Sequence, residues 1–163
     1  MPNTAPEPAQ PYIQLRQRIL SLKPAELGLA PSAASPDVWG VMVELGYEEG
    51  FATLVSLADG TTSLHYSTGG GLLGRADYAP LAEASRALVI AAQKYIHQMP
   101  ITTDFSLPEA GHVRFLLLAY TGIFATDASE KSLVSGDHPL ATLFQRTQEI
   151  LGQLRTLAEK KRV

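Results

Sequence analysis

Two eight-residue runs, VWGVMVEL at 38–45 and VRFLLLAY at 113–120, constrain the fold more than any other part of the chain. In both runs, the odd and the even positions are largely apolar. A strand with two apolar faces is typically covered on both sides, as the interior strands of a layered sheet are. We therefore expect both runs to be interior strands of a single sheet.

Apolar spacing and turn signals predict the elements around these two strands. Further strands are expected at 51–58, 61–67 and 123–127, and helices at 12–22, 80–99 and 139–162, where apolar residues recur at spacings of three and four. Asp59-Gly60 predicts a two-residue hairpin with positive φ at both positions. The order α-βββ-α-ββ-α predicts an α+β domain with a five-stranded, mostly antiparallel sheet and three helices, which cover one face or share the two faces unevenly.

The domain organisation follows from the N-terminal composition. Residues 1–10 contain three prolines and no apolar periodicity, which predicts a disordered tail. Residues 11–163 are expected to form one domain, since about 150 residues is an ordinary domain size.

Composition excludes several classes of function. The chain has no cysteine, so disulfides, thiol catalysis and Cys-ligated zinc are excluded, and a reducing compartment is favoured. The N-terminus lacks the basic and apolar regions of a signal peptide, and no apolar run is long enough to span a membrane. The net charge is −3 and no basic face is visible, which argues against nucleic acid. We expect a cytoplasmic protein with neither a membrane nor a nucleic-acid partner.

The surface is expected to be short of charge. Charged residues make up 18% of the chain, against a typical value of about 25%, while apolar residues make up 45%. This balance favours a face covered by a partner, and we expect a homodimer. Ile90 is the candidate interface residue, because it falls among Glu83, Arg86, Lys94 and His97 on the polar side of its helix. The edge of the 61–67 strand is a second candidate.

Three segments resemble small bacterial proteins of unassigned function: DGTTSLHYSTGGGLLG at 59–74, VRFLLLAYTGIFAT at 113–126 and HPLATLFQRTQEIL at 138–151. This resemblance implies no particular activity. The order of elements is separately similar to that of the type III secretion chaperones, and loosely to that of roadblock and profilin-like modules. Those likenesses imply partner binding, and they concern the fold alone.

The glycine-rich stretch from Gly69 to Gly74 matches G-x-G-x-x-G, the dinucleotide fingerprint. The fingerprint needs a parallel strand before it and a helix that opens within it, whereas here the preceding strand belongs to an antiparallel meander. We therefore expect no nucleotide to bind. A milder possibility is an anion held by backbone N–H groups at a strand-to-helix corner formed by Ser67, Thr68, Gly69, Gly70 and Gly71. The alternative is that these glycines only turn the chain.

Catalytic and metal-binding constellations are not supported. The four histidines, at positions 65, 97, 112 and 138, show no metal-ligand spacing. His65 shares a strand face with Ser63 and Ser67, but side chains two apart on a strand are expected roughly 6.5–7 Å apart, too far for a direct hydrogen bond. Glu44 and Arg114 would form a structural ion pair if their strands are neighbours. We expect no catalytic residue, no metal and no cofactor.

These observations predict a non-enzymatic protein–protein interaction module, with an unidentified partner or a second copy of the chain. The alternative is a small-ligand or anion-binding domain that uses the Ser67–Gly71 corner.

Overall fold

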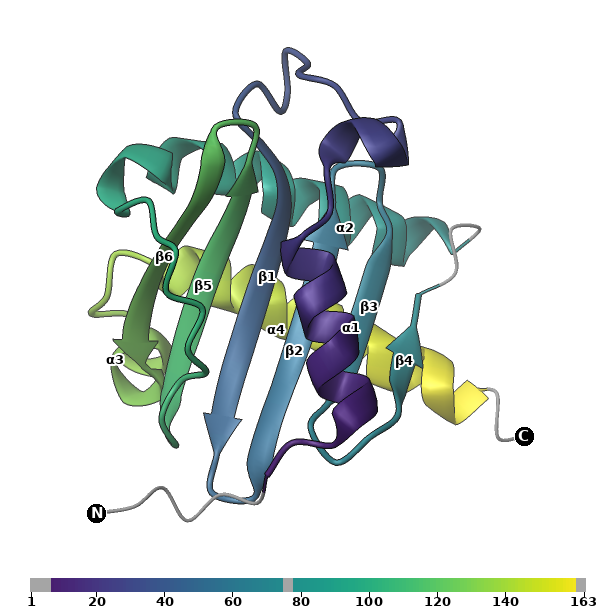
Figure 1. Cartoon of the computed structure of the whole chain (residues 1–163), viewed down its shortest axis with the longest axis vertical. Helices are drawn as coiled ribbons and strands as arrows, with labels where there is room; N and C mark the ends of the chain where they lie inside the picture. Colours follow the sequence, from purple (N-terminus) through teal and green to yellow (C-terminus); the bar gives the residue numbers. More distant parts are fainter. Residues whose placement is uncertain (1–6, 75–77, 161–163) are drawn as a thin grey trace.

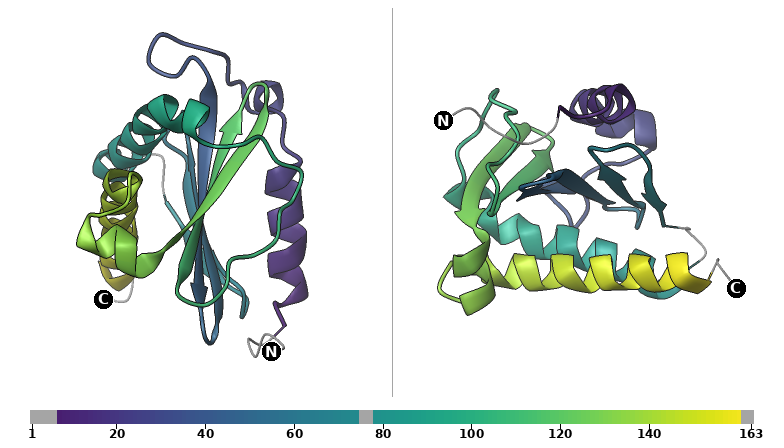
Figure 2. Two further views of the ribbon diagram at one scale, coloured as in Figure 1. Left: turned by 90° about the vertical axis from the view of Figure 1, so that its left-hand side faces the viewer. Right: turned by 90° about the horizontal axis from the view of Figure 1, so that it is seen from below.

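The computed structural model describes residues 7–74 and 78–160, which form three layers (Figures 1 and 2). A sheet forms the middle layer, α1 covers one face, and α2 and α4 cover the other. We call these the α1 face and the α2/α4 face. The strands are β1 (Val38–Tyr47), β2 (Gly50–Leu57), β3 (Thr62–Tyr66), β4 (Gly71–Leu73), β5 (His112–Ala119) and β6 (Gly122–Ser129). The helices are α1 (Gln10–Leu20), α2 (Ala79–Ala92), α3 (Glu130–Ser135) and α4 (Ala141–Lys160), with 3₁₀ helices η1 (Pro24–Leu27) and η2 (Gln93–Gln98).

The α+β class with an antiparallel sheet is confirmed, but the expected counts were wrong. The described residues contain six strands and four α-helices, not five strands and three helices. The additional strand, β4, lies in the glycine-rich stretch, which we expected to be a connection to the next helix without a strand of its own. The additional helix, α3, lies in a stretch that gave no periodic signal, because six residues are too few to show one.

The sheet order is β4-β3-β2-β1-β5-β6, and every neighbouring pair is antiparallel. Strands β1 and β5 lie in the interior, as their two apolar faces predicted, and they are neighbours in the sheet. All of β1 except Tyr47 is buried, and Glu44 of β1 lies opposite Arg114 of β5.

Several boundaries differ from the sequence-based expectation. The β2–β3 turn has a positive φ only at Gly60, where the N–H bonds to the carbonyl of Leu57, so the loop is one residue longer than a two-residue hairpin. Helix α1 begins at Gln10, within the expected disordered tail, and residues 1–6 of that tail lie outside the described residues. Helix α4 begins at Ala141, two residues after the expected Pro139, because His138 accepts the N–H groups of Leu140 and Ala141 and closes a turn there.

The sheet separates two apolar clusters of unequal size. The larger cluster lies on the α2/α4 face and includes Leu88 of α2 and Ile150 of α4, both fully buried. The smaller cluster lies under α1, where Ile19 packs with Met42 and Leu116. Most of the hydrophobic stabilisation therefore comes from the α2/α4 face, since it scales with the apolar area removed from water.

The two edges of the sheet are not equivalent. Along β6, the loop after η2 adds backbone hydrogen bonds, because Thr102 donates to the carbonyl of Ile123 and Ala125 donates to that of Pro100. An isolated bridge pairs Ile101 with Phe124 in the same place. At the other edge, β4 is the outermost strand of the described sheet. The position of this edge corrects our expectation for 61–67, because β3 lies between β2 and β4.

Candidate functional site

The outer edge of β4 presents backbone groups that its neighbour does not use. On either side of β4, Tyr66 donates to the carbonyl of Gly70, and Gly74 donates to that of Thr62. Hydrogen-bonded and non-bonded positions alternate along an antiparallel ladder. Leu72, opposite Leu64, therefore turns its backbone groups toward β3, while Gly71 and Leu73 turn theirs away from it. Gly71 and Leu73 thus form a short template on which another strand can pair.

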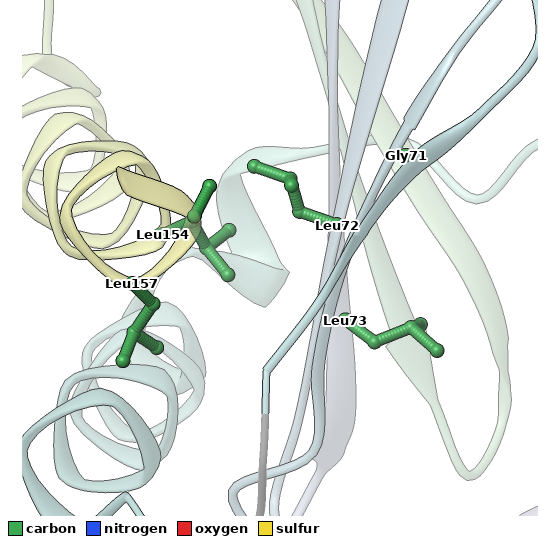
Figure 3. Close-up of a pocket in the computed structure, with 6 residues that line it drawn as sticks. Gly71, Leu72, Leu73, Leu154 and Leu157 are labelled. Atoms are coloured by element: carbon green, nitrogen blue, oxygen red, sulfur yellow. The ribbon is translucent and has the colours of Figure 1, made fainter. Parts of the chain in front are cut away.

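An apolar groove lies beneath this edge, between β4 and the C-terminal half of α4. Leu72 points toward Leu154 and Leu157 of α4, whereas Leu73 points to the opposite side of the sheet (Figure 3). The first hollow of the groove holds about 270 Å³ and is lined by Gly71, Leu72, Leu73, Leu154, Leu157 and Ala158. A second hollow of about 290 Å³ shares Leu72 and Ala158 with the first and is otherwise lined by Tyr66, Arg155 and Glu159. We call the two hollows together the β4–α4 groove.

Leu73 is the most exposed large apolar side chain among the described residues. Its exposed fraction is 72%, and it extends from the α1 face of the edge strand. An isolated exposed leucine is ordinary on a protein surface. Here it adjoins unpaired backbone and an apolar groove, and this combination is typical of a surface that pairs with another chain.

The expected anion corner is a β-hairpin that joins β3 to β4, not a strand-to-helix corner. Ser67 donates its N–H to the carbonyl of Phe51, and its Oγ accepts the N–H of Phe51 at 2.8 Å. Gly69 donates to the carbonyl of Tyr66. Two of the five residues that were expected to cradle an anion therefore already donate their N–H groups within the fold. Gly69 and Gly70 adopt positive φ values of 101° and 80°, which explains glycine at these positions by the turn alone.

A buried polar network joins α1 to the sheet. The Glu44 side chain is fully buried and accepts two bonds from the Arg16 guanidinium, at 2.8 Å from Nε and 2.7 Å from Nη2. It also accepts the Thr53 hydroxyl at 2.8 Å, and Thr53 in turn lies 2.6 Å from the Tyr12 hydroxyl. Arg16 additionally donates to the carbonyl of Phe105.

This network corrects the expected Glu44–Arg114 pair. The two residues are opposite each other, but the Glu44 carboxylate binds Arg16 of α1, and Arg114 binds Asp127 at 3.0 Å. Burial raises the pKa of the Tyr12 hydroxyl to about 12, and the Glu44 carboxylate adds to the shift. Burial alone would lower the pKa of Arg16, but the bonds and charge of Glu44 outweigh it and raise that pKa. The sequence signals for this network are Glu44 within an apolar run and the i, i+4 spacing of Tyr12 and Arg16.

Ser63 and His65 are in direct contact, contrary to the expected separation. The His65 Nε2 atom lies 2.9 Å from the Ser63 Oγ atom, because side chains on a strand lean along it and the imidazole is long enough to cover the gap. Burial lowers the pKa of His65 and so favours the neutral form of the ring. A serine activated for attack also needs a group that orients the histidine, and among the described residues the His65 ring has no hydrogen-bond partner other than Ser63.

The remaining predicted residues are dispersed. Ile90 is 48% exposed on the outer side of α2, and His97 is exposed on η2. In residues 7–74 and 78–160, no group of three or more His, Asp or Glu side chains is placed to hold a metal ion. The same residues contain no helix of the length and apolarity that a membrane span requires.

Comparison of the chain with protein-family models, with curated proteins and with solved structures gives no match. The β4 edge and the groove beneath it therefore have to be interpreted from their own geometry.

Proposed function

We propose that this chain is a non-enzymatic protein-interaction module that binds an extended segment of a partner protein along the edge of β4. The observation that carries the proposal is the juxtaposition of unpaired backbone at Gly71 and Leu73 with the β4–α4 groove. In strand addition, the backbone edge supplies affinity, and pockets for alternate side chains supply specificity. The β4 edge has both parts.

The low charge content supports the same proposal, since a module that covers one surface with a partner needs less charge there. The serine–histidine hydrogen bond of the described residues supports no hydrolase, because the His65 ring has no carboxylate partner to orient it.

A peptide-display selection with random ten-residue segments tests this function. Binders are selected on the full chain and then measured on Leu73→Pro, which removes the outward N–H of the edge without removing a bond to β3. Leu73→Thr keeps that N–H and serves as the matched control. We expect the selected peptides to bind the wild type and Leu73→Thr, and to bind Leu73→Pro much more weakly or not at all. Peptides that bind Leu73→Pro as well as the wild type would refute binding at this edge.

A further inference from the structure

The β4–α4 groove distinguishes among the segments that could pair with β4. Side chains of an added strand alternate between the two faces of the sheet. The residue opposite Leu72 therefore points into the groove, and so does the residue two positions away, opposite Gly70. Its neighbours, opposite Gly71 and Leu73, point to the α1 face and supply the backbone bonds.

The two hollows differ in chemistry. The first has an apolar lining that includes Leu72, Leu154 and Leu157, with Leu72 directed toward Leu154, and it suits an aliphatic side chain (Figure 3). The second is lined by Tyr66, which is paired with Ala52 near the β3–β4 hairpin, and by the charged residues Arg155 and Glu159. A lining with one aromatic and two charged residues suits a tyrosine, whose ring is apolar and whose hydroxyl needs a polar partner.

We infer that the β4 edge selects an extended segment that runs antiparallel to β4 and carries an aliphatic residue followed, two residues later, by a tyrosine. The inference rests on the proposed function and specifies its partner. We assign the antiparallel direction because an antiparallel ladder is slightly more stable per residue, and in that direction the segment passes Leu72 before it reaches Gly70.

The size of the site favours such a segment over a second folded copy. A stable interface between two folded proteins buries about 800 Å² on each partner. The edge offers only three strand residues for pairing. The hollows, of about 270 and 290 Å³, are each of a size to hold one side chain and are too small to receive the surface of a folded domain. The C-terminal end of α4 also lies against β4 on the α2/α4 face of the sheet (Figures 1 and 2).

The test uses the synthetic peptide Lys-Thr-Leu-Thr-Tyr-Thr-Lys with a fluorophore at its N-terminus, titrated with the full chain and followed by anisotropy. We expect saturable binding below about 1 mM. The reversed order, Lys-Thr-Tyr-Thr-Leu-Thr-Lys, should bind about tenfold more weakly, because its tyrosine and leucine fall in the wrong hollows.

N-methylation of the peptide provides a control that does not depend on the folding of a variant. Methylating the threonine between leucine and tyrosine removes a bond to Gly71 and should weaken binding about tenfold or more. Methylating the leucine affects an N–H that points away from β4 and should change affinity less than about threefold. Equal effects of the two methyl groups, equal affinity of the two orders, or no saturation would overturn the inference.

The outcomes separate the inference from the proposed function. Selected peptides that fail to bind Leu73→Pro but lack the aliphatic–x–tyrosine pattern would refute the inference and leave the proposal of strand addition intact. Selected peptides that are indifferent to Leu73→Pro would refute both.

Discussion

Removing Arg16 should destabilise the fold more than removing Arg18, the other charged residue of α1. The Arg16→Met variant keeps most of the side-chain volume but leaves the fully buried Glu44 carboxylate with only the Thr53 hydroxyl as a donor. Loss of one partner from a buried ion pair costs about 3–5 kcal/mol, because the remaining charge stays desolvated. For a domain of this size, such a loss lowers the melting temperature by roughly 6–20 °C.

A double-mutant cycle isolates the coupling between the two residues. Glu44→Gln removes the charge and keeps an acceptor for Thr53, so the double variant Arg16→Met/Glu44→Gln no longer buries an unpaired ion. Its free energy of unfolding should exceed that of Arg16→Met by about 2 kcal/mol or more, in line with couplings measured between contacting charges.

Urea denaturation measures these values, with the single tryptophan, Trp39, as the fluorescent probe, because it is buried in the smaller apolar cluster under α1. Arg18→Met, an exposed arginine on the same helix, is the matched control and should change stability by less than about 0.5 kcal/mol. A cost below about 1 kcal/mol for Arg16→Met, or additive effects in the cycle, would show that Glu44 does not depend on Arg16.

Three further predictions concern pH and association. The pKa of Tyr12 rises from 10.0 to about 12 on folding, so its contribution to the free energy of unfolding is complete below pH 10 and is lost as the pH rises toward 12. The loss should amount to about 2–3 kcal/mol in urea titrations, and Tyr12→Phe should remove it. Burial lowers the pKa of His65 below 6.5, so the stability that is present above pH 6.5 should decline as the pH falls through the lowered value. His65→Gln should make the melting temperature less dependent on pH between pH 7 and 5, and substitution of the exposed His97 by Gln should not. The expected homodimer should elute near twice 17.5 kDa in light scattering, and Ile90→Glu should split a helix-mediated dimer but not an edge-mediated one, whereas a mass of 17.5 kDa at all micromolar concentrations would contradict dimerisation.

The interior of the sheet was predictable from the sequence because its signal is local. Val38–Tyr47 and His112–Ala119 are apolar on both faces, and that pattern alone indicates coverage from both sides. The helices on the α2/α4 face were predictable for the same reason, since their apolar stripes are long enough to show a period.

The candidate site was not predictable, because it depends on contacts between distant segments. Gly71–Leu73 is too short for an alternation to appear, and it reads as part of a glycine-rich turn. The groove needs Leu157 of α4, more than 80 residues away from Leu72, to lie under the edge. The partner of Glu44 was predicted wrongly because strand patterns indicate only which residue of a neighbouring strand could lie opposite, here Arg114. The cation that Glu44 binds, Arg16, comes from the helix that covers this face of the sheet.

The position of β1 in the sheet has a consequence during synthesis on the ribosome. One side of β1 pairs with β2, a few residues later, but the other side waits for β5, and 65 positions separate Tyr47 from His112. At about 5–20 residues per second, that interval is roughly 3–13 s. Throughout this time one edge of β1 stays open, and once Leu73 has been made β1 is an outer strand of the nascent β4-β3-β2-β1 meander. The step most exposed to misassembly therefore involves the centre of the finished sheet, and it ends when β5 leaves the exit tunnel.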